Sequence, residues 1–244
     1  MPAGRPNDLV VDPDRLVLLQ GLRDTRATFD KWNAAPRRVL VPWALGALAI
    51  ALVLLTVVWL IARTVVPDPS KTLLPGLNAP ADGAAIGHIL FRNSLVLMLH
   101  ALACVAGFIA GASLPIQVEN KTGLSRTIHE KAGPLAIAFV GAATLFSLMT
   151  QAWVLGRTAA DLSNQLHISP LTLIVTLLPH AIPELVALFI PLAAWLIASR
   201  RDEWDELLAA TFVTVAIAVP TLVAAACTEV FIWPHLLKAV SPVY

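Results

Sequence analysis

Residues 168–199, ISPLTLIVTLLPHAIPELVALFIPLAAWLIAS, are long and apolar enough to cross a lipid bilayer. The middle of this stretch nevertheless carries two prolines, a histidine and a glutamate: Pro179, His180, Pro183 and Glu184. An ionisable side chain at the centre of a membrane helix costs about 2.5–3.5 kcal/mol on insertion scales. Another part of the chain must offset that cost, so this stretch is the first place to look for function.

The two prolines predict that the helix bends or breaks, because each removes a backbone donor. In one interpretation, residues 170–199 form a single bent helix. In the other, residues 171–178 form a re-entrant half-helix and a full span begins at Pro183. Re-entrant backbone is tolerated only where protein or water covers it. The sequence leaves both alternatives open.

The composition of the 244-residue chain indicates a membrane protein. The chain is 57% hydrophobic and 14% charged, whereas soluble domains carry roughly 25% charged residues. Its net charge of +1 gives no basis for expecting nucleic-acid binding. Cys104 and Cys227 lie in apolar runs, so we interpret them as small buried hydrophobes and not as a disulfide or a metal pair.

Long apolar segments predict an all-α fold, a polytopic membrane bundle of about five transmembrane helices. The expected spans are residues 39–62, 84–115, 132–156, 168–199 and 207–237. The third of these is free of charge but carries a series of polar side chains: Thr144, Ser147, Thr150 and Gln151.

The connecting segments complete this prediction. Four prolines in residues 67–81 exclude a continuous helix there. Residues 116–131 are expected to form a polar loop, and 157–167 a short exit. Residues 1–38 are expected to be a cytoplasmic segment ahead of a bundle formed by 39–244. This segment is either an amphipathic helix, on the membrane surface or against the bundle, or a frayed tail.

Basic residues in the short loops predict the orientation. With the N-terminus inside, twelve Lys and Arg lie in inner segments and four in outer segments. We therefore expect a bacterial inner-membrane protein with a cytoplasmic N-terminus and an external C-terminus. Six tryptophans fall near predicted span ends and are expected to be interfacial anchors: Trp43, Trp59, Trp153, Trp195, Trp204 and Trp233.

Ionisable and polar side chains inside the spans form the candidate site: Arg92, Asn93, His100, His180, Glu184 and Glu229. Counting 1.5 Å per residue puts Arg92 and Glu229 at matching depth, so we predict an ion pair or near contact between them. If residues 170–199 are one bent helix, a second cluster joins His100, His180 and Glu184. If they are re-entrant, Glu184 approaches Arg92 and Glu229, and one cluster holds all of these residues.

Such a cluster has two interpretations. Intramembrane acids and histidines mark ion or proton paths, but they also hold helices in register without conducting anything. His180 and Glu184, one turn apart, with His100 would make a three-ligand zinc site, although no metal or other cofactor is expected. No nucleophile, phosphate-binding or hydrolase motif is present, so we expect no enzymatic activity. Small residues at spacings of four favour close helix packing: Ala103, Gly107 and Gly111.

Three motifs resemble a known family. Residues 178–185, LPHAIPEL, resemble the Pro-His-Gly-x-x-Glu-Leu signature of the stage II sporulation protein M family, with Ala181 in place of Gly and an added Pro183. Residues 228–234, TEVFIWP, resemble its closing motif, and residues 88–94, HILFRNS, its opening motif. The resemblance spans about residues 85–237. The family residues that it carries over are Asn93, His180, Glu184, Glu229 and Pro234.

The resemblance implies a five-span membrane anchor that scaffolds peptidoglycan-remodelling partners. The sequence therefore predicts a non-enzymatic scaffold in the cell envelope, in contact with membrane lipids, which works as a homo-oligomer or with envelope proteins. The alternative is a channel or transporter subunit with an ion or proton site at His180 and Glu184. Broken helices near the bilayer midplane are how many transporters build such sites.

Overall fold

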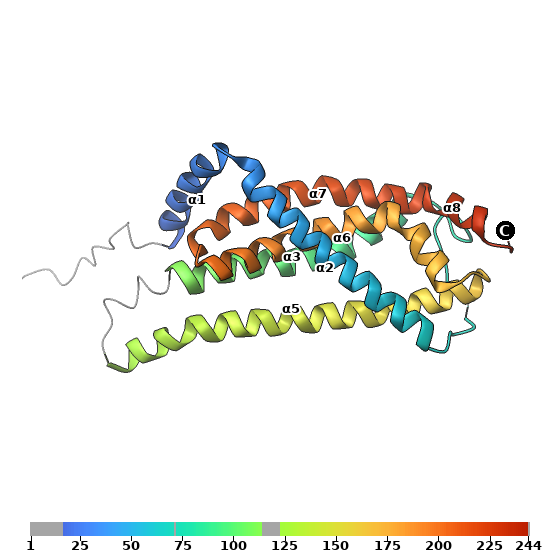
Figure 1. Ribbon diagram of the computed structural model, residues 1–244, viewed down its shortest axis with the longest axis horizontal. Coiled ribbons are helices and arrows are strands. Elements are labelled where there is room, and N and C mark those ends of the chain that lie inside the picture. Colours follow the sequence, from blue (N-terminus) through green and yellow to red (C-terminus); the bar gives the residue numbers. More distant parts are fainter. Residues whose placement is uncertain (1–16, 71, 114–122, 244) are drawn as a thin grey trace, which may run out of the picture.

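The computed structural model describes residues 17–70, 72–113 and 123–243 (Figure 1). Throughout this part of the chain the regular elements are helices, beside one isolated bridge between Pro75 and Ala79. This confirms the all-α fold. In chain order the elements are α1 (Val17–Asn33), α2 (Pro36–Thr64), α3 (Gly83–Phe108), the π-helix η2 (Ile109–Ser113), α5 (Gly123–Gln165), α6 (Pro170–Arg201), the 3-10 helix η3 (Trp204–Glu206), α7 (Leu207–Phe231) and α8 (Trp233–Val240).

Among the described residues, five helical segments are long and apolar enough to cross a membrane, as expected. They are Pro36–Thr64, Gly83–Ala112, Ala132–Gln165, Pro170–Arg201 and Trp204–Val240. The first begins at Pro36, three residues before the predicted span, because a proline without a donor is well placed in the first turn of a helix.

Local signals fix both ends of α6. Ser169 accepts a hydrogen bond from the backbone N–H of Thr172 at 3.0 Å, and Pro170 follows in the first turn. At the other end, Asp202 adopts a left-handed conformation with φ 55° and ψ 29°. The 32 residues between these signals form one helix.

The prolines inside α6 do not interrupt it. The helix continues through Pro179, Pro183 and Pro191, and Figure 1 shows it bending along its course. The single-helix alternative is therefore the one that the chain adopts, and the re-entrant half-helix at 171–178 is not formed. α6 packs on α2, α3 and α7, and 61% of its most apolar window is buried. Neighbouring helices thus cover the backbone groups that the prolines leave unpaired.

α5 is longer than the sequence predicts. It runs for 43 residues, so the expected exit at 157–167 is helical up to Gln165, and the expected loop at 116–131 is helical from Gly123. Both expectations are wrong on these points; residues 114–122 lie outside the described part of the chain. The physical reason is that charged residues mark where a segment leaves lipid, whereas a helix ends only where its backbone pattern is broken.

α5 is also the least enclosed span, with 11% of its most apolar window buried. In Figure 1 it runs along one side of the bundle. Two of its close approaches to the rest of the bundle are at glycines, and its last turns are hydrogen-bonded to the linker through Asp161 and Gln165. A Cβ on Gly133 would lie 2.9 Å from the carbonyl oxygen of Ala110 in η2, and a Cβ on Gly156 would lie 2.6 Å from the side chain of Ile61 in α2.

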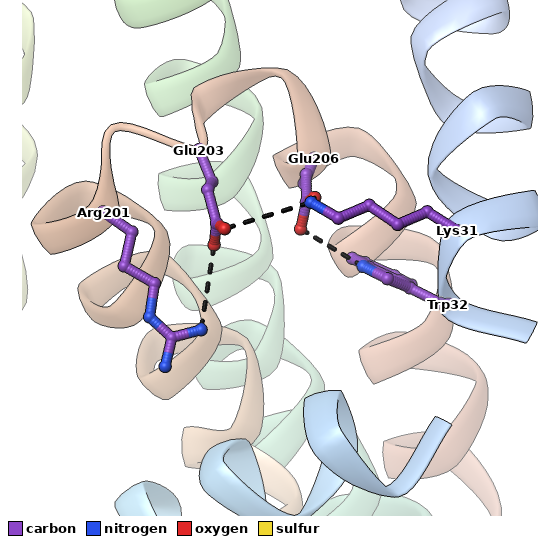
Figure 2. A network of polar contacts seen from close by, with 5 residues as sticks. All are labelled: Lys31, Trp32, Arg201, Glu203 and Glu206. Carbon is purple, nitrogen blue, oxygen red and sulfur yellow. Dashed lines mark hydrogen bonds and ion pairs between the residues drawn. The ribbon is translucent and has the colours of Figure 1, made fainter. Parts of the chain in front are cut away.

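α1 lies against one end of the bundle, so of the alternatives for residues 1–38 the docked helix is observed for Val17–Asn33. Trp32 is 7% exposed, and its ring meets that of Trp43 edge-on at 5.1 Å. Lys31 and the Trp32 indole N–H both donate to Glu206 (Figure 2). We call this end the α1 end.

The opposite end, where the linker between α2 and α3 meets α8, is here called the α8 end. The described residues of this linker contain no helix, as its prolines predict. Gly76 has φ 78°, and a Cβ there would lie 2.7 Å from Cγ of Pro234. The linker therefore lies tightly on the start of α8, the position of the expected family residue Pro234.

Candidate functional site

Three charged side chains from three helices line one cavity of about 340 Å³, which we call the charged cavity. They are Arg92 on α3, Glu184 on α6 and Glu229 on α7. Polar side chains of Asn93 and of α5 complete its polar lining. A second cavity of about 440 Å³ adjoins it and shares the three charged residues; it extends to His180, Trp233 and the linker, and we call it the linker cavity.

Glu184 is held by a neighbouring helix. The Asn93 side-chain amide on α3 donates a hydrogen bond of 3.0 Å to Glu184 Oε1. The resemblance marked these two residues, and the structure brings them together. An amide donor satisfies one lone pair of the carboxylate and supplies no charge, so the contact orients Glu184 without neutralising it.

Arg92 makes no direct ion pair in the described part of the chain. The ion pairs found there, within 4.0 Å, join Lys31, Arg201, Glu203 and Glu206 at the α1 end. The direct Arg92–Glu229 pair is therefore not formed, whereas the looser expectation of proximity holds, because both residues line the charged cavity. Two carboxylates and one guanidinium face this space without forming an ion pair with one another.

His180 lies one turn before Glu184 and lines the linker cavity. Its side chain is 4% exposed and its ring centroid lies 5.2 Å from the Trp233 ring. The Trp233 indole N–H donates to Thr176 Oγ1 at 3.2 Å, which fixes the ring that His180 packs against. His180 Nδ1 has no hydrogen-bond partner. A buried nitrogen without a partner is unusual and requires an explanation.

His100 does not join this cluster. It is fully buried between α3 and α6, where its Nδ1 lies 2.8 Å from the carbonyl oxygen of Leu188. Because a carbonyl only accepts, the ring donates from Nδ1. The expected group of His100, His180 and Glu184 is wrong, and so is the zinc set built on it. Within the described residues no three His, Cys, Asp or Glu side chains could hold a metal ion.

The depth count for a bent helix put Glu184 level with His100. In the structure Glu184 instead lies beside Asn93 in the first half of α3, and His100 lies beside Leu188, one turn further along α6. Cys104 continues this series by donating from Sγ to the carbonyl oxygen of Pro191 at 3.2 Å. α3 and α6 therefore run in the same direction, joined by polar contacts that start at the charged cavity.

The carboxyl-terminal half of the chain has a recognisable relative. Residues 132–234 match the family model of SpoIIM, Stage II sporulation protein M. This confirms the resemblance for the motifs at 178–185 and 228–234, whereas the motif at 88–94 lies outside the matched residues. No curated protein and no solved structure matches the chain.

The SpoIIM match divides the candidate site. His180, Glu184, Glu229 and Pro234 lie inside the matched residues, whereas Arg92 and Asn93 lie on α3, before them. The match is thus shorter than the expected family core of 85–237. Residues inside and outside the SpoIIM match therefore line the charged cavity together, and the hydrogen bond from Asn93 to Glu184 joins the two sets.

Sequence reasoning missed part of the cavity lining. Thr150 and Gln151, in the SpoIIM-matched part of α5, line the charged cavity, and His88 on α3 lines both cavities. The polar series on α5 was visible, but its spacing does not reveal which neighbour it faces. Gln151 donates to Ser147 Oγ at 3.0 Å on the same helix.

The small residues of α3 and η2 lie at the α1 end, away from the charged cavity. Ala103 is buried. A Cβ on Gly107 would lie 2.7 Å from Leu207 Cδ1, and one on Gly111 would lie 2.3 Å from Cγ of Trp204. These residues therefore admit large side chains from the SpoIIM-matched helices and from η3.

The expectation that six tryptophans face the membrane surface is too simple. Trp43, Trp195 and Trp233 are buried in protein, while Trp153 is largely exposed. Positions near a span end are also where α1, α8 and η3 cover the bundle, so these rings pack against the chain itself. Both cysteines are free; Cys104 is buried, and Cys227 is half-buried.

Proposed function

We propose that this chain is a non-enzymatic, multi-pass membrane protein that binds a small polar or ionic group in the charged cavity, as a subunit of a channel or transporter. The observation that supports this proposal is that Arg92, Glu184 and Glu229 face one open cavity without an ion pair among them. Intramembrane charges of this kind are costly and mark functional paths.

A purely structural role fits this geometry less well. Charged residues that only hold helices together are expected to pair and to exclude space, because an unpaired charge in a low-dielectric interior is strongly unfavourable. Here two carboxylates share a cavity with one guanidinium, which leaves one negative charge uncompensated when all three are ionised. A proton or a cationic ligand would neutralise it.

The α1 side of the charged cavity is closed by buried side chains. His100, Phe189 and Cys104 occupy the space between α3 and α6 beyond Leu188. Transport through this protein therefore requires a second conformation that opens this half, as expected for alternating access. From the positive-inside count we propose a cytoplasmic N-terminus, with the cavity towards the outer face of the bacterial inner membrane.

A second candidate function is the scaffold in cell-envelope remodelling, acting as a homo-oligomer or with envelope proteins. The SpoIIM match favours it, since that resemblance implies a membrane anchor for peptidoglycan-remodelling partners. With the N-terminus inside, the linker at the α8 end would lie on the outer side of the membrane, where peptidoglycan lies. Affinity capture of the membrane-extracted protein tests this role: recovery of the protein alone, as a monomer, would exclude a scaffold.

Proteoliposomes test the transport proposal. The wild-type protein is expected to conduct protons, inorganic cations or amphiphiles down an imposed gradient. Glu184→Gln should lower that flux by at least about tenfold, because it removes a charge from the binding cavity. Glu203→Gln is the matched control, since it makes the same change at the α1 end. The absence of any flux from the wild type, or equal flux from Glu184→Gln, would refute the proposal.

A further inference from the structure

We propose that the ligand of the charged cavity is a zwitterionic amphiphile, namely a phospholipid with a phosphoethanolamine head group. This inference rests on the proposed binding function and names its ligand class. Arg92 would bind the phosphate, Glu184 and Glu229 would bind the ammonium group, and the apolar walls would hold the start of the acyl chains.

The charges match such a head group in sign, with one guanidinium for the phosphate and two carboxylates for the ammonium group. Because the zwitterion adds no net charge, one of the two carboxylates would carry a proton in the complex. A guanidinium binds phosphate through two parallel hydrogen bonds, and Arg92 has no carboxylate within ion-pair distance that would occupy it. An ammonium group has three donors and suits two carboxylates. Glu184 already has one oxygen oriented by Asn93, which leaves its other oxygen for the ligand.

A second observation comes from His180. Its side chain is 4% exposed, it lines the linker cavity, and its Nδ1 lacks a partner. Buried polar atoms normally have a hydrogen-bond partner. A ligand that fills both adjoining cavities would supply one, because the ester and phosphate oxygens of a phospholipid lie next to its head group.

The cavity walls and their surroundings favour a lipid over a soluble molecule. Leu55, Val58, Val154, Leu162 and Leu177 line the linker cavity from three helices. Cavities of about 340 and 440 Å³ fall within the range of small-ligand sites.

The approach to the charged cavity also favours entry from the bilayer. α3 and α5 border this cavity, and both carry large apolar side chains that are exposed on the protein, such as Phe91, Leu95 and Phe146. In a membrane such surfaces face lipid tails. A lipid therefore reaches the site laterally, with its acyl chains remaining in the hydrocarbon region.

Native mass spectrometry of the purified full chain in detergent tests this proposal. The probes are dioleoyl phosphatidylethanolamine, phosphatidylglycerol and phosphatidylcholine, together with water-soluble glycerophosphoethanolamine. The expected result is retention of phosphatidylethanolamine at least about tenfold above phosphatidylglycerol, whose head group lacks the cation. Phosphatidylcholine should bind more weakly, because its methylated nitrogen cannot donate to the carboxylates.

Variants make the assignment specific. Arg92→Gln should weaken phosphatidylethanolamine binding by about tenfold, and Arg92→Lys should restore part of it. The double variant Glu184→Gln with Glu229→Gln should shift the preference towards phosphatidylglycerol, since it keeps the phosphate site and removes the ammonium site. Arg201→Gln and Glu203→Gln, at the α1 end, are matched controls. Circular dichroism and size-exclusion profiles establish that each variant is folded.

The outcomes separate this inference from the function on which it rests. Equal binding of all three lipids, or a preference for phosphatidylglycerol in the wild type, overturns it, and so does binding of glycerophosphoethanolamine as tight as that of the lipid. If inorganic ions are transported in a Glu184-dependent way but phosphatidylethanolamine does not bind, the proposed function survives and the lipid does not. If phosphatidylethanolamine binds selectively but nothing is transported, the proposed lipid site is supported and the proposed transport function is refuted.

Discussion

The two halves of the α3–α6–α7 bundle differ in the kind of polar group that they hold. Towards the α1 end, His100 and Cys104 are neutral, buried and bound to backbone carbonyls of α6, and Gly107 admits Leu207 and Trp195, although His100 Nε2 and Trp195 Nε1 have no hydrogen-bond partner. Towards the α8 end, Arg92, Glu184 and Glu229 face cavities.

This difference indicates which polar residues hold the helices together and which can bind a ligand. A neutral group bound to a carbonyl has a fixed partner and packs without space around it. Charged groups that lack a mutual ion pair retain an open cavity. Substitutions in the half towards the α1 end, here the closed half, should therefore lower stability. Substitutions in the half towards the α8 end, here the open half, should lower ligand binding. The predictions that follow test this contrast in order of expected size.

Replacing His100 with Ala should cause the largest loss of stability. The change removes the hydrogen bond to Leu188 and leaves a void in the closed half, at a cost of about 2–4 kcal/mol in the free energy of unfolding. Unfolding by SDS titration in mixed micelles measures it. His88→Ala is the matched control: it removes an exposed imidazole from the same helix in the open half, and should cost little. Equal losses would erase the contrast between the halves.

Gly111→Ala should be the next largest effect. Its Cβ would lie 2.3 Å from Cγ of Trp204, so the tight packing of η2 on η3 must give way, at about 1–3 kcal/mol. Gly87→Ala provides the control, because nothing lies within 4 Å of the Cβ added there. In a helix interior that change should be neutral or slightly stabilising. A Gly111→Ala protein as stable as wild type would show that the α1 end packs less tightly than described.

The contact between Lys31 and Glu206 should contribute about 0.5 kcal/mol to the docking of α1, since Lys31 is largely exposed. Its hydrogen bond to Glu206 raises the pKa of Lys31 above the ordinary value of 10.5. The stabilisation is therefore complete below pH 10.5 and is lost as the pH rises through the folded pKa.

Hydrogen exchange of residues 17–33 measures this docking. Glu206→Gln should speed exchange at pH 7 and reduce its dependence on high pH. Glu203→Gln should speed exchange less than Glu206→Gln, because the Glu203 carboxylate lies 4.0 Å from the Lys31 nitrogen. If both variants exchange like the wild type, the aromatic contacts of Trp32 hold α1 without help from the charges.

Asp24→Asn should have the smallest effect, and in the stabilising direction. Partial burial and the nearby charge of Asp205 raise the pKa of Asp24 above its ordinary value of 3.8. Folding therefore disfavours the ionised carboxylate, so stability falls as the pH rises through that range. The variant should stabilise the docking of α1 at pH 7 by a few tenths of a kcal/mol, which slows its hydrogen exchange. Below pH 3.8 its exchange should match that of the wild type. Faster exchange at pH 7 would contradict the sign.

The sequence predicted the five spans well, because apolar length reports directly on the bilayer. It also selected Asn93, Glu184 and Glu229, which the structure brings together around the charged cavity. It misplaced His100, because a count of residues from a predicted span end does not show which residues of two neighbouring helices lie side by side. It underestimated α5, because polar residues outside the lipid do not stop a helix. The docking of α1 depends on tertiary contacts of Trp32 and Glu206, which no local pattern contains.

The length of α5 has a mechanical consequence. Two of its close approaches to the rest of the protein, at Gly133 and Gly156, are separated by 23 residues of one helix, or about 35 Å at 1.5 Å per residue. A swing of about 5° around one of them would displace the other by about 3 Å, comparable to the width of a water molecule. Because Gln151 and Leu155 lie on this arm, such a small tilt would change the width of the charged cavity's border with α3. A small tilt of the least buried span would therefore act on the cavity that its polar face lines.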